Sequence, residues 1–493
     1  MSAAAVGAGL GAAATAADAA SNGGAPAFAP GQVVVGYRSP AGSNVEATAA
    51  RAVGARPGMK PDTRTRVLHV PVGQVHATIA RLRKQAGVAY AAPNPIAHVD
   101  GSTGGATPSA APSDTTTQAT PETPIVPAEP PAPPPLAAMP DDPGIRGFPG
   151  GLAGLQWNFF GPWGVNALQA WANVNAVGAT GGKGVRIAVL DTGIAWHDFG
   201  TFKKSPDFGN TKFVAPYDFV DHTRRVVDRN GHGTHVAGTI AEATNNRIGV
   251  SGLAYGATIM PIRVLDSNGY GNAAAIAKGI RYAAEHNAKV INMSLEFATS
   301  VKSSDIPDII SAIRYANARG ATVIGSTGNE GEARLAYPAR TTAVIAVGAT
   351  TDTGCLASFS NDGFNLDIVA PGGGDNQALP QDPNCTANHG RYIYQETYTS
   401  SVGKFGLPSG YRGTSMAAPH VSATAALLIA SRVLGSSPTP SQVECRLKAT
   451  ARPLGLPGPN RTYGWGLVDA GAATSPTVQT PTCMGAAARA SPR

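Results

Sequence analysis

The nonapeptide G-T-S-M-A-A-P-H-V, residues 413–421, places a serine at the start of a long apolar run. This run, residues 416–430, is apolar on nearly every face, which predicts a helix buried on all sides. Ser415 then lies at the positive end of the helix dipole, where developing negative charge is stabilised. Pro419 falls early in the run, where a missing N–H costs least. A serine in this place is either a helix cap or a nucleophile, and other parts of the chain decide between the two.

Strand-like and helix-like segments alternate before this stretch. Short apolar segments predict buried strands at residues 185–190, 258–264, 289–293, 321–326 and 343–347. Helical patterns lie between them at residues 232–242, 273–285 and 306–318. The alternation predicts an α/β fold with a mostly parallel sheet. In such sheets, functional residues collect at the carboxyl ends of the strands.

Two polar residues follow predicted strands, and a histidine motif lies between them. Asp191 belongs to V-L-D-T-G, Asn329 to S-T-G-N-E-G, and His232 to N-G-H-G-T-H-V-A-G. By itself, an Asp or Asn beside a glycine is ordinary turn punctuation. His232 and His235 also permit a metal pair, but neither an H-E-x-x-H pattern nor a nearby cysteine supports one.

Together with Ser415, these residues are the parts of an acyl-transfer site: a carboxylate, a histidine, an amide donor and a serine at a helix start. Their chain order, Asp then His then Ser, is the order found in subtilisin and differs from that of chymotrypsin and the α/β-hydrolases. The serine motif also lacks the G-x-S-x-G pattern of lipases and esterases. The pattern therefore favours one class of serine peptidase.

The three motifs resemble the active-site motifs of the subtilisin-like serine peptidases, in the same order, and the similarity extends over about residues 156–473. The segments V-I-N-M-S-L, residues 290–295, and Y-G-W-G-L-V-D-A, residues 463–470, also resemble family elements. The resemblance implies a subtilisin-like three-layer α/β fold. It also implies a serine endopeptidase that cleaves protein or peptide substrates and needs no cofactor for catalysis.

The resemblance assigns a role to each matching residue. Ser415 Oγ attacks the peptide carbonyl, and His232 takes its proton and returns it to the leaving amine. Asp191 orients His232, and Asn329 binds the oxyanion together with the Ser415 backbone N–H. His235 is expected to be structural, with a hydrogen bond inside its own helix.

Substrate is expected to bind as an added extended strand. The segments that match the family's substrate-binding residues contain Ser294, Leu295, Gly269, Tyr270 and Gly271. The family usually has a glycine after the Ser-Leu pair, whereas this chain has Glu296 and Phe297. Phe297 would narrow the wall of the pocket. Glu296 would favour a basic neighbour, and a solvent-facing glutamate is the alternative.

The segment N-N-R-I-G-V, residues 245–250, resembles the calcium loop of many relatives. The resemblance implies a structural calcium ion held by oxygen ligands from Asn246, Ile248 and Val250, with Asp198 as the carboxylate. A plain turn without metal is the alternative.

Composition divides the chain into four regions. Residues 1–27 are alanine-rich and lack a basic residue before Arg38, which predicts a disordered tail or a degenerate signal peptide. Residues 28–100 form a small α+β unit, and residues 101–142 form a Pro/Ala-rich linker exposed to proteolysis. The resemblance assigns residues 143–493 to the peptidase domain.

The small unit shows strand patterns at residues 33–35, 66–72 and 88–94 and helical patterns at residues 45–53 and 75–84. With one more short strand before Arg66, which the pattern does not show, the order would be the βαββαβ of a ferredoxin-like unit. The segment Y-A-A-P-N, residues 90–94, resembles the family's inhibitory propeptide, which implies an intramolecular inhibitor and cleavage between Val99 and Asp142. A permanent accessory domain is the alternative.

Overall composition narrows the partners and the compartment. The 493 residues are 14% charged with a net charge of +7, and the Lys and Arg residues are not clustered, which argues against nucleic acid. No apolar run is long enough for a membrane crossing, and a monomer is expected. The four cysteines suggest two disulfides and a secreted or extracytoplasmic protein. The pairs nearest in sequence are Cys355–Cys385 and Cys445–Cys483, and four free thiols are the alternative.

Two further functions remain open at this stage. One is a dedicated processing peptidase with a narrow substrate, which the insertion-like segment at residues 373–412 permits. The other is a catalytically inactive subtilisin-fold binding protein, although all four catalytic positions hold the appropriate residue types.

Overall fold

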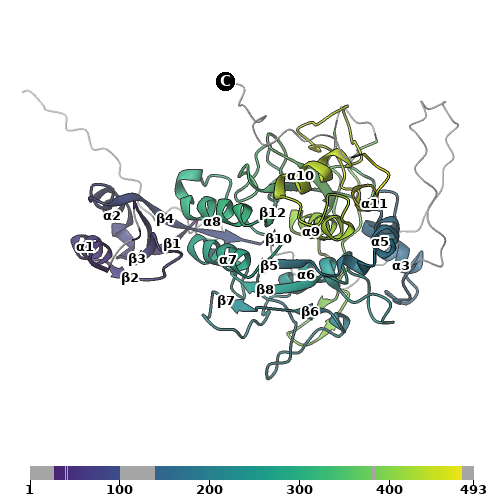
Figure 1. Cartoon of the computed structure of the whole chain (residues 1–493), viewed down its shortest axis with the longest axis horizontal. Coiled ribbons are helices and arrows are strands. Elements are labelled where there is room, and N and C mark those ends of the chain that lie inside the picture. Colours follow the sequence, from purple (N-terminus) through teal and green to yellow (C-terminus); the bar gives the residue numbers. More distant parts are fainter. Residues whose placement is uncertain (1–26, 39, 41–42, 100–138, 380–383, 480–493) are drawn as a thin grey trace, which may run out of the picture. The chain divides into compact units, whose positions relative to one another are not determined.

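The computed structural model describes residues 27–38, 40, 43–99, 139–379 and 384–479 (Figure 1). The chain divides into two compact units, Met1–Ile96 and Ala97–Arg493. Most of the predicted tail, residues 1–27, and of the predicted linker, residues 101–142, lies outside these described ranges. None of the helices within the described ranges combines the length and the apolar character that a membrane crossing requires.

The first unit has the ferredoxin-like order that the sequence suggested. Its elements are β1 (Phe28–Tyr37), α1 (Ser43–Val53), β2 (Arg56–Pro57), β3 (Thr65–His69), α2 (Val75–Leu82) and β4 (Val88–His98). The four strands pair antiparallel in the order β4-β1-β3-β2. Apolar residues of β1, β3 and both helices form the core of this unit. The strand that the sequence pattern missed is β2, because two residues are too few to show a periodicity.

The second unit is built on a parallel sheet. Its strands are β5 (Arg186–Asp191), β6 (Lys212–Phe213), β7 (Tyr217–Asp218), β8 (Thr258–Arg263), β10 (Val290–Met293), β12 (Thr322–Ser326), β13 (Ile345–Thr350) and β14 (Ile368–Pro371). Their order is β14-β13-β12-β10-β5-β8-β6, with β7 also paired to β8. All of these pairs are parallel, and the central strands are buried, as the apolar segments predicted.

Helices cover both faces of this sheet. They are α3 (Gly151–Leu155), α4 (Trp157–Phe160), α5 (Ala167–Ala176), α6 (His232–Ala241), α7 (Ala273–Glu285), α8 (Pro307–Ala318), α9 (Thr414–Ser431), α10 (Pro440–Ala449) and α11 (Ala470–Thr474). Figure 1 shows α7 and α8 on one side of the sheet and α6 and α9 on the other. The short strands β9 (Tyr270–Asn272), β11 (Glu296–Phe297), β15 (Thr397–Tyr398) and β16 (Phe405–Gly406) lie outside the sheet. The predicted three-layer α/β fold is confirmed.

Helix α9 is buried almost completely. Every one of its residues except Ile429 is buried, and its apolar side chains join the core that packs against the sheet. The prediction of a helix buried on all sides is therefore confirmed. A central buried helix holds its first residues rigidly, which matters because Ser415 is one of them.

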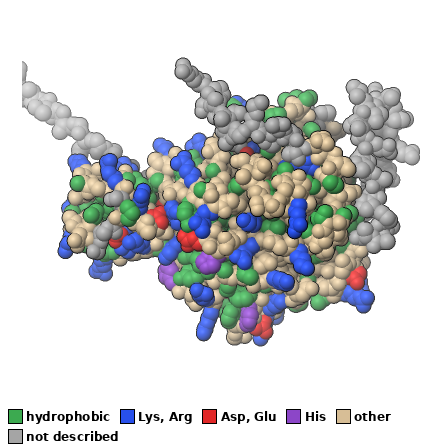
Figure 2. Space-filling view, in the orientation of Figure 1, with side chains coloured by type: hydrophobic (Ala, Val, Ile, Leu, Met, Phe, Trp, Pro, Cys, Tyr) green, Lys and Arg blue, Asp and Glu red, His purple; other side chains and the backbone are tan. Residues whose placement is uncertain are grey.

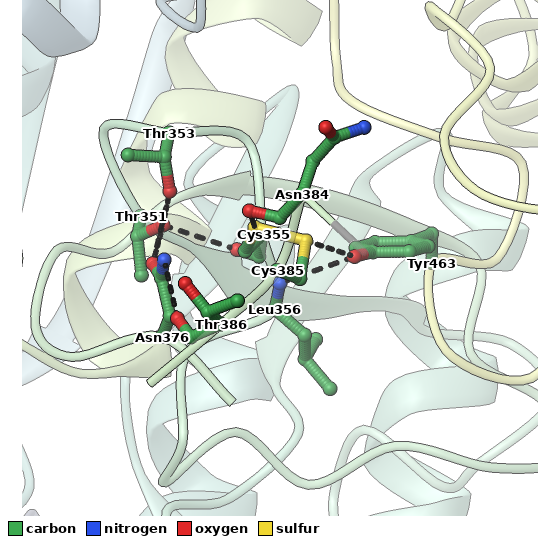
Figure 3. The surroundings of a disulfide bond; sticks show 9 residues. All are labelled: Thr351, Thr353, Cys355, Leu356, Asn376, Asn384, Cys385, Thr386 and Tyr463. Atoms are coloured by element: carbon green, nitrogen blue, oxygen red, sulfur yellow. Dashed lines mark hydrogen bonds between the residues drawn. A yellow bond between two sulfur atoms is a disulfide. The ribbon is translucent and has the colours of Figure 1, made fainter. Parts of the chain in front are cut away.

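A disulfide joins Cys355 to Cys385, as predicted, and closes the segment between them (Figure 3). Tyr463 lies against it, with its hydroxyl 3.7 Å from Cys385 Sγ and within hydrogen-bond reach of the Leu356 backbone N–H. The second predicted pair includes Cys483, which lies outside the described residues.

Figure 2 shows one face of the molecule with side chains coloured by type. On this face the Lys and Arg side chains are spread among other residues rather than gathered into one patch. A charge of +7 distributed in this way gives no concentrated positive field on the visible face.

Candidate active site

The carboxyl end of β5 brings Asp191 to the first turn of α6. His232 Nδ1 donates a hydrogen bond to Asp191 Oδ1 at 2.8 Å, and the Thr192 backbone N–H donates to the same oxygen at 2.7 Å. Both side chains are almost fully buried. Because Nδ1 is the donor, Nε2 is left free to accept a proton.

A second carboxylate, which the sequence did not single out, fixes this arrangement. Asp228 Oδ1 accepts from Thr192 Oγ1 and from the backbone N–H groups of Asn230 and Gly231, at 2.9–3.0 Å. Its Oδ2 accepts from the backbone and hydroxyl of Thr234. Asp228 therefore ties the turn after β5 to the start of α6. The only sequence signal was an Asp four residues before the histidine, which is also common in turns.

His235, the second histidine of the motif, has a different environment. Its Nε2 donates to the Ile393 carbonyl oxygen at 3.0 Å, and its ring stacks on Tyr411 at 4.1 Å between centroids. The expected hydrogen bond inside its own helix is therefore wrong, because the partner lies in the segment at residues 373–412. Burial lowers the pKa of His235 to about 3, so this imidazole stays neutral.

His420 in α9 is also buried and neutral. Its Nδ1 donates to the Met416 carbonyl oxygen, and its Nε2 accepts from the Asn158 side chain, each at 2.8 Å. Burial lowers the pKa of His420 to about 4. Of the three histidines, His232 is the one that contacts a carboxylate, and it is therefore the one suited to carry a positive charge transiently.

Ser415 lies in the first turn of α9, and its carbonyl oxygen bonds to a side chain instead of to the helix backbone. Pro419 has no N–H, so it cannot bond to the carbonyl four residues earlier, that of Ser415. Ser294 Oγ donates to this carbonyl oxygen instead, at 2.8 Å. Asn292 donates to Ser294 Oγ and accepts from Ser422 in α9. Proline in the helix thus couples the segment after β10 to the turn that carries Ser415.

The hydroxyl of Ser415 points toward the same segment. Ser415 Oγ donates a long hydrogen bond of 3.4 Å to the Ser294 carbonyl oxygen, and no hydrogen bond joins it to His232 among the described residues. His232 Nε2 is buried and has no hydrogen-bond partner there. Helices α6 and α9 pack against each other. The structure thus forms the Asp191–His232 link and leaves the histidine nitrogen that would accept a proton unoccupied.

Asn329 lies beside the start of α9. Its Oδ1 accepts from the Thr414 backbone N–H at 2.8 Å and from the Thr414 hydroxyl at 3.0 Å. Its Nδ2 donates to Glu296 Oε1 at 3.1 Å. Fixing the amide oxygen in this way turns the amide N–H groups away from Thr414, the orientation in which a side-chain amide can donate to an oxyanion.

Two of the predicted substrate-binding segments flank a short extended stretch of the second unit, residues 97–99. Ala97 and His98 pair antiparallel with β11, directly after Ser294–Leu295. On the other side, the Val99 N–H donates to the Gly269 carbonyl oxygen at 3.1 Å, in the turn before β9. Extended backbone in this place pairs on both edges, as an added substrate strand would.

The segment at residues 373–412 packs against α6. The hydroxyl of Thr397 donates to the Gly231 carbonyl oxygen at 2.6 Å, and the hydroxyl of Tyr398 donates to the Asp228 carbonyl oxygen at 3.1 Å. Together with the Ile393 contact to His235, these bonds hold the start of the helix that carries His232. Residues 393, 397 and 398 of this segment thus help to fix the helix that carries His232.

The proposed calcium loop contacts a carboxylate, but not that of Asp198. Both oxygens of Asp207 accept hydrogen bonds, one from Asn246 Nδ2 at 2.9 Å and one from the Val250 N–H at 2.8 Å. The side chain of Asp198 is 61% exposed and accepts from the Lys204 N–H. The structure therefore brings Asp207, and not Asp198, to the loop. The extra residues between V-L-D-T-G and Asp207 concealed this placement in the sequence.

Further carboxyl groups gather behind this loop. Asp142 accepts from the loop backbone and from Ser251, and Glu396 accepts from the Asp207 N–H and donates its own N–H to Glu242. Burial, together with the nearby charges of Glu396 and Asp142, raises the pKa of Asp207 to about 8. Burial also raises the pKa of Glu242 well above its usual range. Buried carboxyl groups that face one another offer the oxygen ligands that a divalent cation takes.

Comparison with known proteins defines the class. Residues 182–466 match the subtilase family, and residues 14–94 match the Fervidolysin N-terminal prodomain. The chain is 40% identical over 315 residues to Subtilisin Savinase of Lederbergia lenta, covering 64% of this chain and 98% of the relative. It is 36% identical over 269 residues to Thermitase of Thermoactinomyces vulgaris, covering 55% and 81%.

A solved structure of a protease from Pseudoalteromonas arctica matches 68% of this chain and 98% of its own, with 30% identity and a TM-score of 0.54. The fold, the motifs and these matches define a serine endopeptidase of the subtilisin type with an N-terminal prodomain. The chain belongs to the subtilase family.

Proposed function

We propose that the chain is a self-processing zymogen in which Asp191, His232 and Ser415 hydrolyse peptide bonds through an acyl-enzyme. Ser415 Oγ attacks the carbonyl carbon, and its proton passes to His232 Nε2. Asp191 holds Nδ1 and stabilises the charged imidazole, and His232 then returns the proton to the leaving amine. Water repeats the sequence on the ester. The observation that carries this proposal is the 2.8 Å Asp191–His232 bond, with Nε2 buried and without a hydrogen-bond partner in the described part of the chain.

Asn329 Nδ2 and the Ser415 backbone N–H supply the oxyanion donors in this mechanism. In this mechanism the Ser415 side chain turns away from the Ser294 carbonyl and toward the histidine. A bond as long as 3.4 Å opposes that rotation weakly.

The first unit acts as the intramolecular inhibitor until it is cut off. This role is supported by the match to a prodomain and by residues 97–99, which occupy both backbone edges of the substrate segments. We place the cut beyond Val99 and before Asp142. The disulfide at Cys355–Cys385 is consistent with an oxidising, extracytoplasmic location, where the prodomain would be removed.

A structural calcium ion would be held by the Asp207 carboxylate, the Asn246 side-chain oxygen and the backbone carbonyls of Ile248 and Val250. The ion would neutralise the buried carboxyl groups behind the loop and take no part in the chemistry. In the structure Asn246 Oδ1 accepts from the Ile248 N–H at 2.8 Å, which holds this side chain within the loop.

A fluorophosphonate probe tests the proposed nucleophile. The purified protein should be labelled once, and Ser415→Ala should abolish the label, whereas Ser437→Ala, which changes an exposed serine, should keep it. The same samples, incubated and sequenced from the new N-terminus, should show a cut between residues 99 and 142 in the wild type and none in Ser415→Ala. Labelling that survives Ser415→Ala would overturn the assignment of the nucleophile.

A further inference from the structure

Residues 97–99 show how an extended peptide lies in the second unit. His98 is directly opposite Glu296 in the antiparallel pair with β11, and Ala97 is opposite Phe297. Directly opposite residues of an antiparallel pair have their side chains on the same face. The side chain at the position of His98 therefore lies beside that of Glu296.

Two carboxylates meet at this position. His98 Nε2 is 4.0 Å from Glu296 Oε1, and one ligand atom from each of His98, Glu296 and Glu330 lies within 4.8 Å of the other two. Glu296 is 2% exposed and accepts from Asn329, while Glu330 accepts from the Asn361 side chain. The side-chain amides of Asn329 and Asn361 thus orient the two carboxylates.

Gly328 makes room for both acids. A Cβ atom at this residue would lie 2.4 Å from Glu296 Oε2 and 2.8 Å from Glu330 Oε2. Its φ of +110° is also one that other residues rarely adopt. The turn after β12 thus has a shape in which two carboxylates approach each other, although like charges repel.

We propose that Glu296 and Glu330 form an acidic substrate subsite that selects a Lys or Arg side chain at the strand position of His98. The inference rests on the proposed peptidase function and adds the substrate class. A buried carboxylate is stabilised by a cationic partner, and a substrate side chain brings one only when it is basic. Lys and Arg side chains are long enough to reach from the paired strand to both acids. In this chain the residue at that strand position is His98, which is also basic.

A divalent cation is the competing occupant, because an imidazole and two carboxylates are also metal ligands. That site would need His98 as its third ligand, so it would exist only while a histidine occupies the strand. A subsite for basic side chains makes no such demand and keeps its selectivity after residue 98 has been removed. The two occupants therefore predict different substrate profiles.

The test uses the mature enzyme and quenched peptides that differ at one position. Sequencing the processed enzyme gives the number of residues between His98 and the cut, which fixes that position relative to the scissile bond. Arg, Lys, His, Gln, Met and Glu are compared there, with EDTA and then with added Zn²⁺. We expect kcat/KM to be about tenfold higher for Arg and Lys than for Gln and Met, with Glu lowest.

Variants assign the selectivity to the two acids. Glu330→Gln should reduce the Lys-to-Gln ratio several-fold, and Glu330→Arg should improve cleavage of the Glu peptide relative to the Lys peptide. The matched control Glu332→Gln removes an exposed charge two residues away and should leave the ratio unchanged. Because Glu296 contacts Asn329, the variant Glu296→Gln is judged only by its Lys-to-Gln ratio and not by its absolute rate.

A flat profile in the wild type, or a ratio that survives the double change Glu296→Gln and Glu330→Gln, would overturn the subsite. Selectivity confined to the His peptide and to added Zn²⁺ would also overturn it and assign a metal site instead. If no peptide is cleaved and the probe does not label Ser415, the peptidase proposal itself fails, which is a separate result.

Discussion

Two groups of buried carboxylates in the second unit contrast with each other. At the end of β5, Asp191 faces an imidazole at 2.8 Å and receives a backbone N–H. Behind the calcium loop, Asp207, Glu242 and Glu396 face one another, and burial raises the pKa of the first two. A carboxylate beside an imidazole can stabilise the ring when it takes up a proton. Carboxyl groups that face each other need a proton or a cation to remain buried.

The largest effect is expected when the contact between Asp191 and His232 is changed. Asp191→Asn should lower kcat by about 10⁴-fold, the order found for this change in trypsin and for removal of the corresponding aspartate in subtilisin, because the amide favours the wrong histidine tautomer. Unfolding by denaturant should change far less. Initial rates on a quenched peptide measure the loss, and Asp198→Asn, which changes an exposed carboxylate, is the control. A loss below about tenfold would contradict the role given to Asp191.

Lowering the pH should reduce the stability of the folded protein through His235 in α6 and His420 in α9, which are both buried. Their folded pKa values of about 3 for His235 and about 4 for His420 lie below the unfolded value, so the unfolded chain binds more protons. The contribution of these histidines to stability is therefore full above pH 6.5 and falls toward pH 4, by about 1.4 kcal/mol per pH unit for each histidine. Denaturant unfolding of Ser415→Ala, which avoids autolysis, measures this slope, and the added change Glu242→Gln removes the opposing slope of that acid. A profile from pH 6.5 to 4.5 that is flat in both variants would exclude the contribution of the histidines.

Calcium bound at the loop of residues 245–250 should stabilise the folded protein, because it would neutralise the carboxyl groups behind that loop. At a calcium concentration 100 times Kd, binding should add about 2.7 kcal/mol to the free energy of unfolding, and chelation should remove it. The Tm of Ser415→Ala with calcium or EDTA measures the difference, with magnesium as the control ion. Asp207→Asn should abolish the calcium-dependent shift and Asp198→Asn should retain it. Equal shifts in both variants would show that Asp207 is not a ligand.

The smallest effect concerns Glu242. Its folded pKa lies above the unfolded value, so the folded chain binds more protons, and stability without calcium should fall as pH rises above about 4.5. The slope is at most about 1.4 kcal/mol per pH unit, opposite in sign to that of the histidines. Glu242→Gln should flatten this alkaline side, as unfolding curves in EDTA would show. An unchanged slope in that variant would exclude Glu242 as its source.

Much of the fold followed from local patterns. Buried strands and the apolar helix α9 show continuous apolar runs, because nothing on them faces water. Strand β2 escaped notice because two residues carry no period, and His235 was assigned a partner in its own helix because a distant carbonyl leaves no local signal. Asp228 was missed for the same reason, since its five hydrogen bonds depend on two turns meeting.

The amino-acid sequence by itself determined the family and the layered α/β architecture and predicted Asp191, His232, Asn329 and Ser415 as the site residues, because motifs and apolar periodicity are local properties. Tertiary structure alone decided that Asp207, and not Asp198, contacts the loop at residues 245–250 and that Glu296 and Glu330 approach the strand position of His98. These pairs lie apart along the chain, and whether their charges meet depends on how loops of unpredictable length return to the sheet.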